Sequence, residues 1–339
     1  MSTTSVSVIF LSYKQERFVE AALLSALRQD FESYELIIAD DASPDGTFSV
    51  IERVLAENPN PRVRLKVIRQ TKNLGIIGNF NSALAAASGE IFVVMAGDDV
   101  SYPSRTRRMV DAFRSDPTLK SVSCACRVID GEGNTVESRP PNLVSRVYRH
   151  GRGRKDPFAG APVTGACAAY HRSLFDIFGI LPPDANGEDV DYIFRALLAG
   201  QVMYTGEVLV DYRIHGANAF NYAATAISDA EYMNKEIRFA EIISMRDRQW
   251  LRDLETALNA GLIDEDRACH VRKAVAQHVD RHRIFALSLG VAPMGEWWLV
   301  AKRLLAAGDF VKVAKMLSLR LFASRRSAHL TWTKERRGR

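Results

Sequence analysis

Short apolar runs alternate with segments of helical periodicity through the first hundred residues of the chain. Such alternation predicts parallel strands joined by helices, in a sheet whose two faces are both covered. We therefore predict an α/β fold with a mostly parallel central sheet, and ligands of such sheets bind at the carboxyl ends of the strands. The expected strands are residues 6–11, 35–39, 63–68 and 91–95, and the expected helices are residues 18–27, 48–55 and 80–87.

Two pairs of adjacent aspartates stand at that end of the predicted sheet. Asp98 and Asp99 follow the fourth apolar run, and Asp40 and Asp41 follow the second. Adjacent carboxylates repel each other, so the pair at Asp98 favours a bound divalent cation over a plain acidic turn. Because Mg²⁺ and Mn²⁺ combine carboxylate oxygens with phosphate oxygens, this pair predicts a site for a metal-bound diphosphate.

Other polar residues are expected at the same edge. Ser12 and Tyr13 follow the first predicted strand, and the carboxylate of Asp41 can accept hydrogen bonds from a base N–H or from ribose hydroxyls. His215 follows a later predicted strand, near residues 202–213. A lone histidine is often an ordinary surface residue, but this position makes it a candidate third metal ligand.

A helix predicted in the second half of the chain opens with two acids, Glu188 and Asp189. Its apolar residues form one stripe, which would turn both acids and Tyr192 away from the buried face. Acids are also common in a first helical turn because of the helix dipole. Asp191 and Arg195 have i,i+4 spacing for an ion pair, which leaves Glu188 and Asp189 as the candidates for catalysis.

Composition excludes several classes of protein. The chain is 47% apolar and 25% charged, as soluble domains are, and no apolar run reaches the length of a membrane span. The N-terminus lacks the features of a signal peptide. The four cysteines form no C-x-x-C pair and fit a reduced cytoplasm, and we expect no zinc at Cys124 and Cys126, because strand alternation puts both on one buried face. The net charge of +5 comes without a nucleic-acid-binding signature, so no nucleic-acid partner is expected.

The remaining segments are less regular. Residues 119–129 predict a further strand, and residues 138–165, rich in Pro, Gly and Arg, predict a mobile loop with the length of a lid. From about residue 226 the chain is mostly helical. Basic amphipathic stripes between residues 297 and 321 favour binding to a membrane surface, or packing against the catalytic domain or a second subunit.

Five motifs in order make residues 5–220 resemble glycosyltransferase family 2. The motifs are Val6–Tyr13, Ala39–Thr47, Asn73–Gly75, Gly97–Asp99, and Gly187–Asp189 with Arg195. The resemblance implies a GT-A fold in residues 1–225, followed by a helical C-terminal extension in residues 226–339. It also implies a nucleotide-sugar donor, Mn²⁺ or Mg²⁺ as cofactor, and inversion at the anomeric carbon.

The resemblance assigns roles to individual residues as well. Asp189 would be the general base, with Glu188 supporting it. The implied donor-binding residues are Ser12, Tyr13, Asp41, Asn73 and Asp98, and the implied metal ligands are Asp98, Asp99 and His215. One departure concerns the Asp-x-Asp of the family, which often begins two residues before Asp98, where this chain has Ala96. Which of Asp98 and Asp99 contacts the donor and which binds the metal is therefore left open.

The predicted function is sugar transfer to a hydroxyl of a saccharide or lipid-linked acceptor in cell-surface polysaccharide assembly. UDP is the expected nucleotide, with dTDP and GDP open. The basic residues 146–155 would close over the donor phosphates or grip an anionic acceptor. The expected location is the cytoplasm. Attachment to the inner face of the plasma membrane and a homo-oligomer are left open.

Three alternatives compete with this prediction. A sugar-phosphate nucleotidyltransferase would carry a glycine-rich, basic loop after the first strand, where this chain has Ser12–Glu16. A non-catalytic nucleotide-sugar binding or scaffold protein would have no need of Asp98, Asp99 and Asp189. A receiver-like signalling domain would place its acidic pair after the first strand, whereas this chain places its pairs after the second and the fourth.

Overall fold

The computed structural model of the chain forms two units. The first contains residues 1–222 and 252–269, and the second contains residues 223–251 and 270–339. Residues 252–269 thus group with the first unit, whereas the sequence predicts a single boundary near residue 225. The described residues of the second unit are helical. The structure describes residues 4–136, 144–149, 165–183, 185, 187–216, 246, 248–288, 298 and 302.

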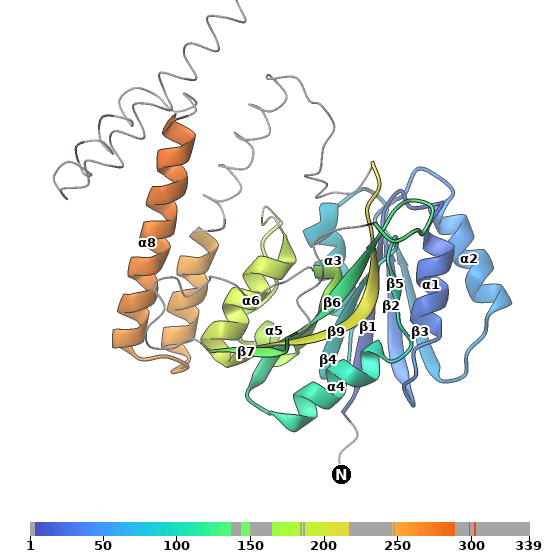
Figure 1. The fold of residues 1–339 in the computed structure, drawn as a ribbon, viewed down its shortest axis with the longest axis horizontal. Coiled ribbons are helices and arrows are strands. Elements are labelled where there is room, and N and C mark those ends of the chain that lie inside the picture. The colour runs from blue at the N-terminus through green and yellow to red at the C-terminus, as the bar shows by residue number, and fades with distance from the viewer. Residues whose placement is uncertain are drawn as a thin grey trace, which may run out of the picture. The chain divides into compact units, whose positions relative to one another are not determined.

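The first unit is built on a nine-stranded sheet in the order β3-β2-β1-β4-β8-β6-β9-β5, with β7 paired to β9 (Figure 1). Strands β1 to β4 pair in parallel and are strongly apolar except at the β3 edge, as strands covered on both faces are. The other pairs are antiparallel, apart from β6 with β9. The strands are Val6–Ser12, Tyr34–Asp40, Val63–Arg69, Ile91–Ala96, Val100–Ser101, Leu119–Ile129, Arg146–Arg149, Ala168–His171 and Gln201–Arg213, β1 to β9 in chain order.

Helices cover both faces of this sheet (Figure 1). Apolar residues of α1, α2 and α4 pack with one face, and those of α3, α5 and α6 pack with the other. A 3-10 turn, η1, precedes β8, and a long helix, α8, follows the helical residues 248–259. The bounds are Val19–Leu27, Thr47–Glu57, Gly75–Ala86, Arg105–Ser115, Ser173–Phe178 and Glu188–Ala199 for α1 to α6, Gly165–Cys167 for η1, and Glu265–Ser288 for α8.

The strands predicted in the first half and at residues 119–129 are confirmed. Helix α3 begins at Gly75 rather than at residue 80, so the predicted start is wrong. The predicted loop is also wrong in part, because β7 lies inside it and pairs with β9, and only this pairing makes such a short segment a strand. The expectation that Cys124 and Cys126 share one buried face is wrong for Cys126, which is partly exposed. Residues 138–143 and 150–164 of that loop lie outside the described residues, and so do residues 297–321 apart from Trp298 and Lys302. Within the described residues, no helix combines the length and the apolar character that crossing a bilayer requires.

Candidate active site

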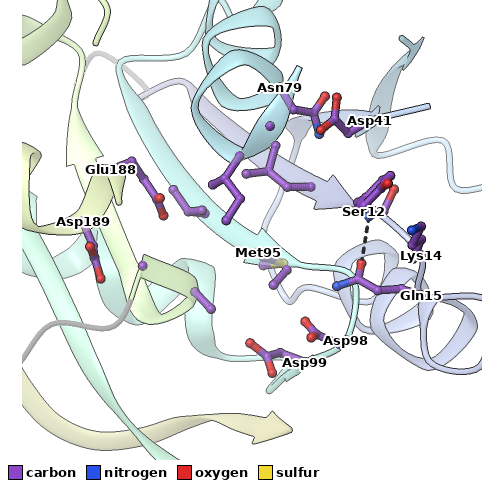
Figure 2. A pocket seen from close by; sticks show the side chains of 18 of the residues that line it. Ser12, Lys14, Gln15, Asp41, Asn79, Met95, Asp98, Asp99, Glu188 and Asp189 are labelled. Carbon is purple, nitrogen blue, oxygen red and sulfur yellow. Dashed lines mark hydrogen bonds between the residues drawn. The ribbon is translucent and has the colours of Figure 1, made fainter. Parts of the chain in front are cut away.

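The carboxyl ends of β1, β2 and β4 open into a cavity of about 540 Å³. Parallel strands place these ends at one edge, so residues far apart in sequence meet there. Figure 2 shows Asp41 near the start of α3, Asp98 and Asp99 beyond the end of β4, and Glu188 and Asp189 across the cavity from Ser12. Every residue predicted for the site lines this cavity: Ser12, Tyr13, Asp41, Asn73, Asp98, Asp99, Glu188, Asp189 and His215.

The two residues of the first acidic pair, Asp40 and Asp41, have different surroundings, because Asp40 is buried within the fold and Asp41 lines the cavity. Asp40 is fully buried, and its carboxylate accepts hydrogen bonds from Ser12 Oγ at 3.2 Å and Ser43 Oγ at 2.6 Å. Asp41 lines the cavity, and its Oδ1 accepts a hydrogen bond from the backbone N–H of Leu74 at 2.7 Å. Burial raises the pKa of Asp41. The backbone at the start of α3 therefore holds the Asp41 carboxylate at the cavity, while Asp40 fixes the loop.

The second pair, Asp98 and Asp99, lies just beyond β4. Asp99 Oδ1 accepts a hydrogen bond from the backbone N–H of Arg213 at 2.8 Å, and Asp99 Oδ2 is buried with no hydrogen-bond partner among the described residues. Burial first, and then the charge of Asp98, raise the pKa of Asp99 well above its usual value. Asp98 Oδ2 lies 3.1 Å from His215 Nε2. A buried carboxylate oxygen without a donor, beside a second carboxylate, is the arrangement that a bound cation would satisfy.

The residues present fit a divalent cation that is shared with a ligand. Among the described residues, no three acidic, histidine or cysteine side chains are arranged to hold a metal by themselves. Mg²⁺, however, commonly uses one or two carboxylates together with substrate phosphates. Asp98 and Asp99 meet that need, and His215 as a further ligand stays a prediction.

Arg213, which the sequence analysis did not single out, organises this part of the cavity wall. Its Nε donates to the carbonyl oxygen of Asp98 at 2.9 Å, and its Nη1 donates to that of Asp130 at 3.0 Å. The rings of Phe18 and His215 lie 4.6 Å apart, and the Arg213 guanidinium lies 5.0 Å from the Phe18 ring. The sequence shows an arginine at the end of a predicted strand, but neither its burial nor its partners, which lie in loops, can be predicted from periodicity.

Helix α6 carries Glu188 and Asp189 at its start, but the predicted orientation of this helix is wrong. Tyr192 is completely buried, and its ring lies 4.7 Å from Phe175 and 5.3 Å from Tyr170. Glu188 is 8% exposed. A single apolar stripe assumes one covered face, whereas α6 packs among residues of both the sheet and α5.

The burial of Glu188 changes the proton affinity of its carboxyl group. Burial first, and then the charge of Asp189, raise the pKa of Glu188 to about 8. At neutral pH Glu188 therefore keeps its proton, beside a second carboxyl on the same helical turn. Pairs of acids whose environments differ in this way commonly divide proton-holding and proton-accepting roles.

This pKa shift predicts a dependence of stability on pH. Between pH 4.5 and about 8, folded Glu188 holds a proton that the unfolded chain has lost. The free energy of unfolding therefore decreases as pH rises through this window. We expect Glu188→Gln to flatten that decrease, measured as urea midpoints of the metal-free protein across the window. A decrease as steep in the variant as in the wild type would contradict the shift.

The C-terminal half of α6 is also fixed by a buried ion pair that the sequence did not indicate. Arg195 was expected to pair with Asp191, but its Nε and Nη2 bind the carboxylate of Asp253 at 2.9 and 3.0 Å. Arg195 Nη1 donates to the carbonyl oxygen of Gly179 at 2.8 Å. The side chains of Arg195 and Asp253 are 1% and 3% exposed. The sequence offers no signal for this pair, because its members lie 58 residues apart.

Comparison with known proteins identifies relatives of a large part of this chain. Residues 7–178 match the family described as "Glycosyl transferase family 2". An uncharacterized glycosyltransferase of Nostoc sp. is 31% identical over 67% of this chain and 70% of its own length. The chondroitin synthase of Escherichia coli is 26% identical over 63% of this chain, which is 29% of that protein.

Solved structures share the fold. The crystal structure of S. aureus TarS 1-349 in complex with UDP-GlcNAc matches with a TM-score of 0.52, covering 92% of this chain and 90% of that one. The two sequences are 17% identical, so this likeness concerns the architecture alone. It agrees with the GT-A fold expected for the first unit.

Proposed function

Because the chain belongs to glycosyltransferase family 2, we propose that it transfers a sugar from a UDP-sugar to a hydroxyl of a saccharide or lipid-linked acceptor, with inversion. One observation carries the proposal. A single cavity unites a polar wall at Ser12 and Asp41, the buried pair Asp98 and Asp99, and the acids of α6. A transferase of this kind must bind a nucleotide, must bind a diphosphate, and must have a general base that takes the proton of the acceptor. This cavity offers candidate residues for all three roles.

The donor would lie along the ends of β1, β2 and β4. Asp41 and Tyr13 would contact the base, and Asn73 and Ser12 would line the same wall. The complex of TarS with UDP-GlcNAc supports UDP as the first nucleotide to test. Asp98 and Asp99 would hold Mn²⁺ or Mg²⁺, which when bound supplies positive charge near the leaving diphosphate.

The acceptor would enter on the side of α6. Its hydroxyl has too high a pKa to attack unaided, so a carboxylate within hydrogen-bond reach must take the proton in the transition state. Asp189 would be that base. Glu188, which is protonated at neutral pH, would keep a second negative charge away from Asp189 and leave it as the proton acceptor of the pair. A single displacement from this side inverts the sugar carbon.

Nucleotide binding tests the donor site directly. Thermal unfolding is measured with UDP, GDP and dTDP, each with and without Mn²⁺, for the wild type and for Asp99→Asn. We expect UDP to stabilise the wild type only with Mn²⁺, by about 2.7 kcal/mol at a hundredfold excess over Kd, because the ligand binds only the folded state. Asp99→Asn should lose this shift.

The matched control is Asp111→Asn, which changes an exposed acid on α4 that lies 3.7 Å from Arg114. It should keep the full shift. The proposal fails if no nucleotide stabilises the wild type, or if Asp99→Asn shifts as the wild type does. A response to GDP or dTDP instead of UDP would change the identity of the donor nucleotide and would leave the proposed donor site in place.

A further inference from the structure

Arg105, the first residue of α4, is a fully buried cation that the proposed mechanism does not use. Its Nη1 donates to Ser101 Oγ at 2.8 Å, and its Nη2 donates to the carbonyl oxygen of Val94 at 2.7 Å. The remaining nitrogen, Nε, is buried without a hydrogen-bond partner among the residues that the structure describes. Burying a charge is costly unless its surroundings compensate for it. An arginine at this position therefore needs an explanation beyond the filling of space.

The two acceptors of Arg105 lie on either side of the second acidic pair. Val94 belongs to β4 and Ser101 belongs to β5, and Asp98 and Asp99 lie between these two residues in the chain. The guanidinium therefore closes residues 94–101 into a loop. Because a guanidinium is planar and its donors point in fixed directions, it holds both acceptors at a fixed separation.

Other hydrogen bonds hold the middle of this loop. The backbone N–H of Gly97 donates to the carbonyl oxygen of Leu11 at 2.8 Å. Asp99 Oδ1 accepts a hydrogen bond from the backbone N–H of Arg213 at 2.8 Å. These contacts fix the loop near its centre, whereas Arg105 joins its two ends. Arg105 is thus placed to set the shape of the loop without lining the cavity itself.

The hydrogen bonds of Arg105 leave the carboxylates of the acidic pair available to a cation. Within the described part of the chain, they go only to a hydroxyl and a carbonyl oxygen, which are both neutral. Asp99 Oδ2 stays without a donor. Burial and the charge of Asp98 raise the pKa of Asp99, and the charge of Arg105 opposes that rise. Arg105 therefore favours a charged pair without occupying the place of a bound metal.

We propose that Arg105 is a positioning residue, which holds Asp98 and Asp99 in the arrangement that binds a divalent cation. The inference rests on the proposed function, because it requires that this pair binds the cation together with the donor diphosphate. Without the bridge, Val94 and Ser101 are free to separate, and the carboxylate oxygens lose the spacing that one cation requires. Substituting residues that hold metal ligands in place commonly costs about 10–100-fold in metal affinity.

Calorimetric titration of UDP into the full chain, at one fixed Mn²⁺ concentration, tests the proposal without an activity assay. Arg105→Met keeps the length of the side chain but removes its charge and its donors. We expect it to raise the Kd of the metal-bound nucleotide by about 10–100-fold. Ser101→Ala keeps the charge and removes one end of the bridge, so it should raise the Kd by about tenfold, the lower end of that range.

Arg107→Met is the matched control, since Arg107 is an exposed arginine of α4 that pairs with Asp30 at 3.1 Å. It should bind as the wild type does. Arg105→Lys keeps the charge, but a single ammonium does not hold both acceptors at a fixed separation, so we expect its Kd to stay above that of the wild type. Urea unfolding of each metal-free variant shows that the protein titrated is folded. Ser101→Ala, a small change, stays informative even where Arg105→Met prevents folding.

The outcomes distinguish this inference from the proposed function. If folded Ser101→Ala binds with the Kd of the wild type, the bridge does not position the pair and the inference is wrong. Full recovery of the wild-type Kd in Arg105→Lys would also overturn it, because the charge alone would then be sufficient. A wild type that binds neither UDP, GDP nor dTDP with Mn²⁺ would overturn the proposed function, and this inference with it.

Discussion

Asp189→Asn is expected to lower turnover by about 10²–10⁴-fold, which is the usual contribution of a positioned general base. Asparagine keeps the shape of the side chain but cannot take the proton of an acceptor hydroxyl. The donor should still bind, because Ser12, Asp41 and the pair at Asp98 are unchanged. The measurement is nucleotide release from the donor identified by the stability series, in the presence of acceptor, with kcat and KM determined separately.

The nucleotide-dependent shift in thermal stability is the control for this variant. We expect Asp189→Asn to keep the shift of the wild type, whereas Asp99→Asn loses it. Loss of turnover together with loss of the shift would mean that Asp189 supports the donor site rather than the acceptor. Turnover within tenfold of the wild type would exclude Asp189 as the base.

Positions at strand ends were the part of the site that the sequence predicted best. Asp41, Asp98 and Asp99 each follow an apolar run, and parallel strands bring all such positions to one edge of the sheet. The strand pattern of the first half therefore predicted both the fold and the edge at which the acids meet. The strand pattern alone could not predict that Asp41 lines the cavity while Asp40 supports the loop, because this depends on donors such as Ser43 and the backbone of Leu74.

Features that depend on contacts distant in sequence could not be predicted. The amphipathic pattern of α6 describes this helix in isolation, so it does not indicate that Tyr192 and Glu188 are buried by other elements. Arg213 donates its backbone N–H to Asp99 across 114 residues. Strand β7 exists through its pairing with β9, inside a segment whose composition is typical of loops. Each of these depends on tertiary packing, which periodicity and composition do not report.

The pair of Arg195 with Asp253 leads to the largest expected effect on stability. Asp253→Ala would leave the Arg195 guanidinium buried with its main partner removed, since both side chains are at most 3% exposed. Breaking a buried pair in this way typically costs about 3–5 kcal/mol. Urea unfolding should show a correspondingly lower midpoint. Glu255→Ala, an exposed change on the same helix, should stay within about 0.5 kcal/mol of the wild type.

The double variant Arg195→Met with Asp253→Leu distinguishes the loss of a charge partner from the loss of packing. Replacing both members of a buried pair with apolar residues is often neutral or stabilising, so this variant should recover most of the stability that Asp253→Ala loses. If it does not, the segment around residue 253 supports the first unit through shape rather than charge. Recovered stability with normal turnover would show that α6 needs only a packed neighbour to hold Asp189. Recovered stability with reduced turnover would mean that the bidentate pair itself sets the position of the α6 N-terminus.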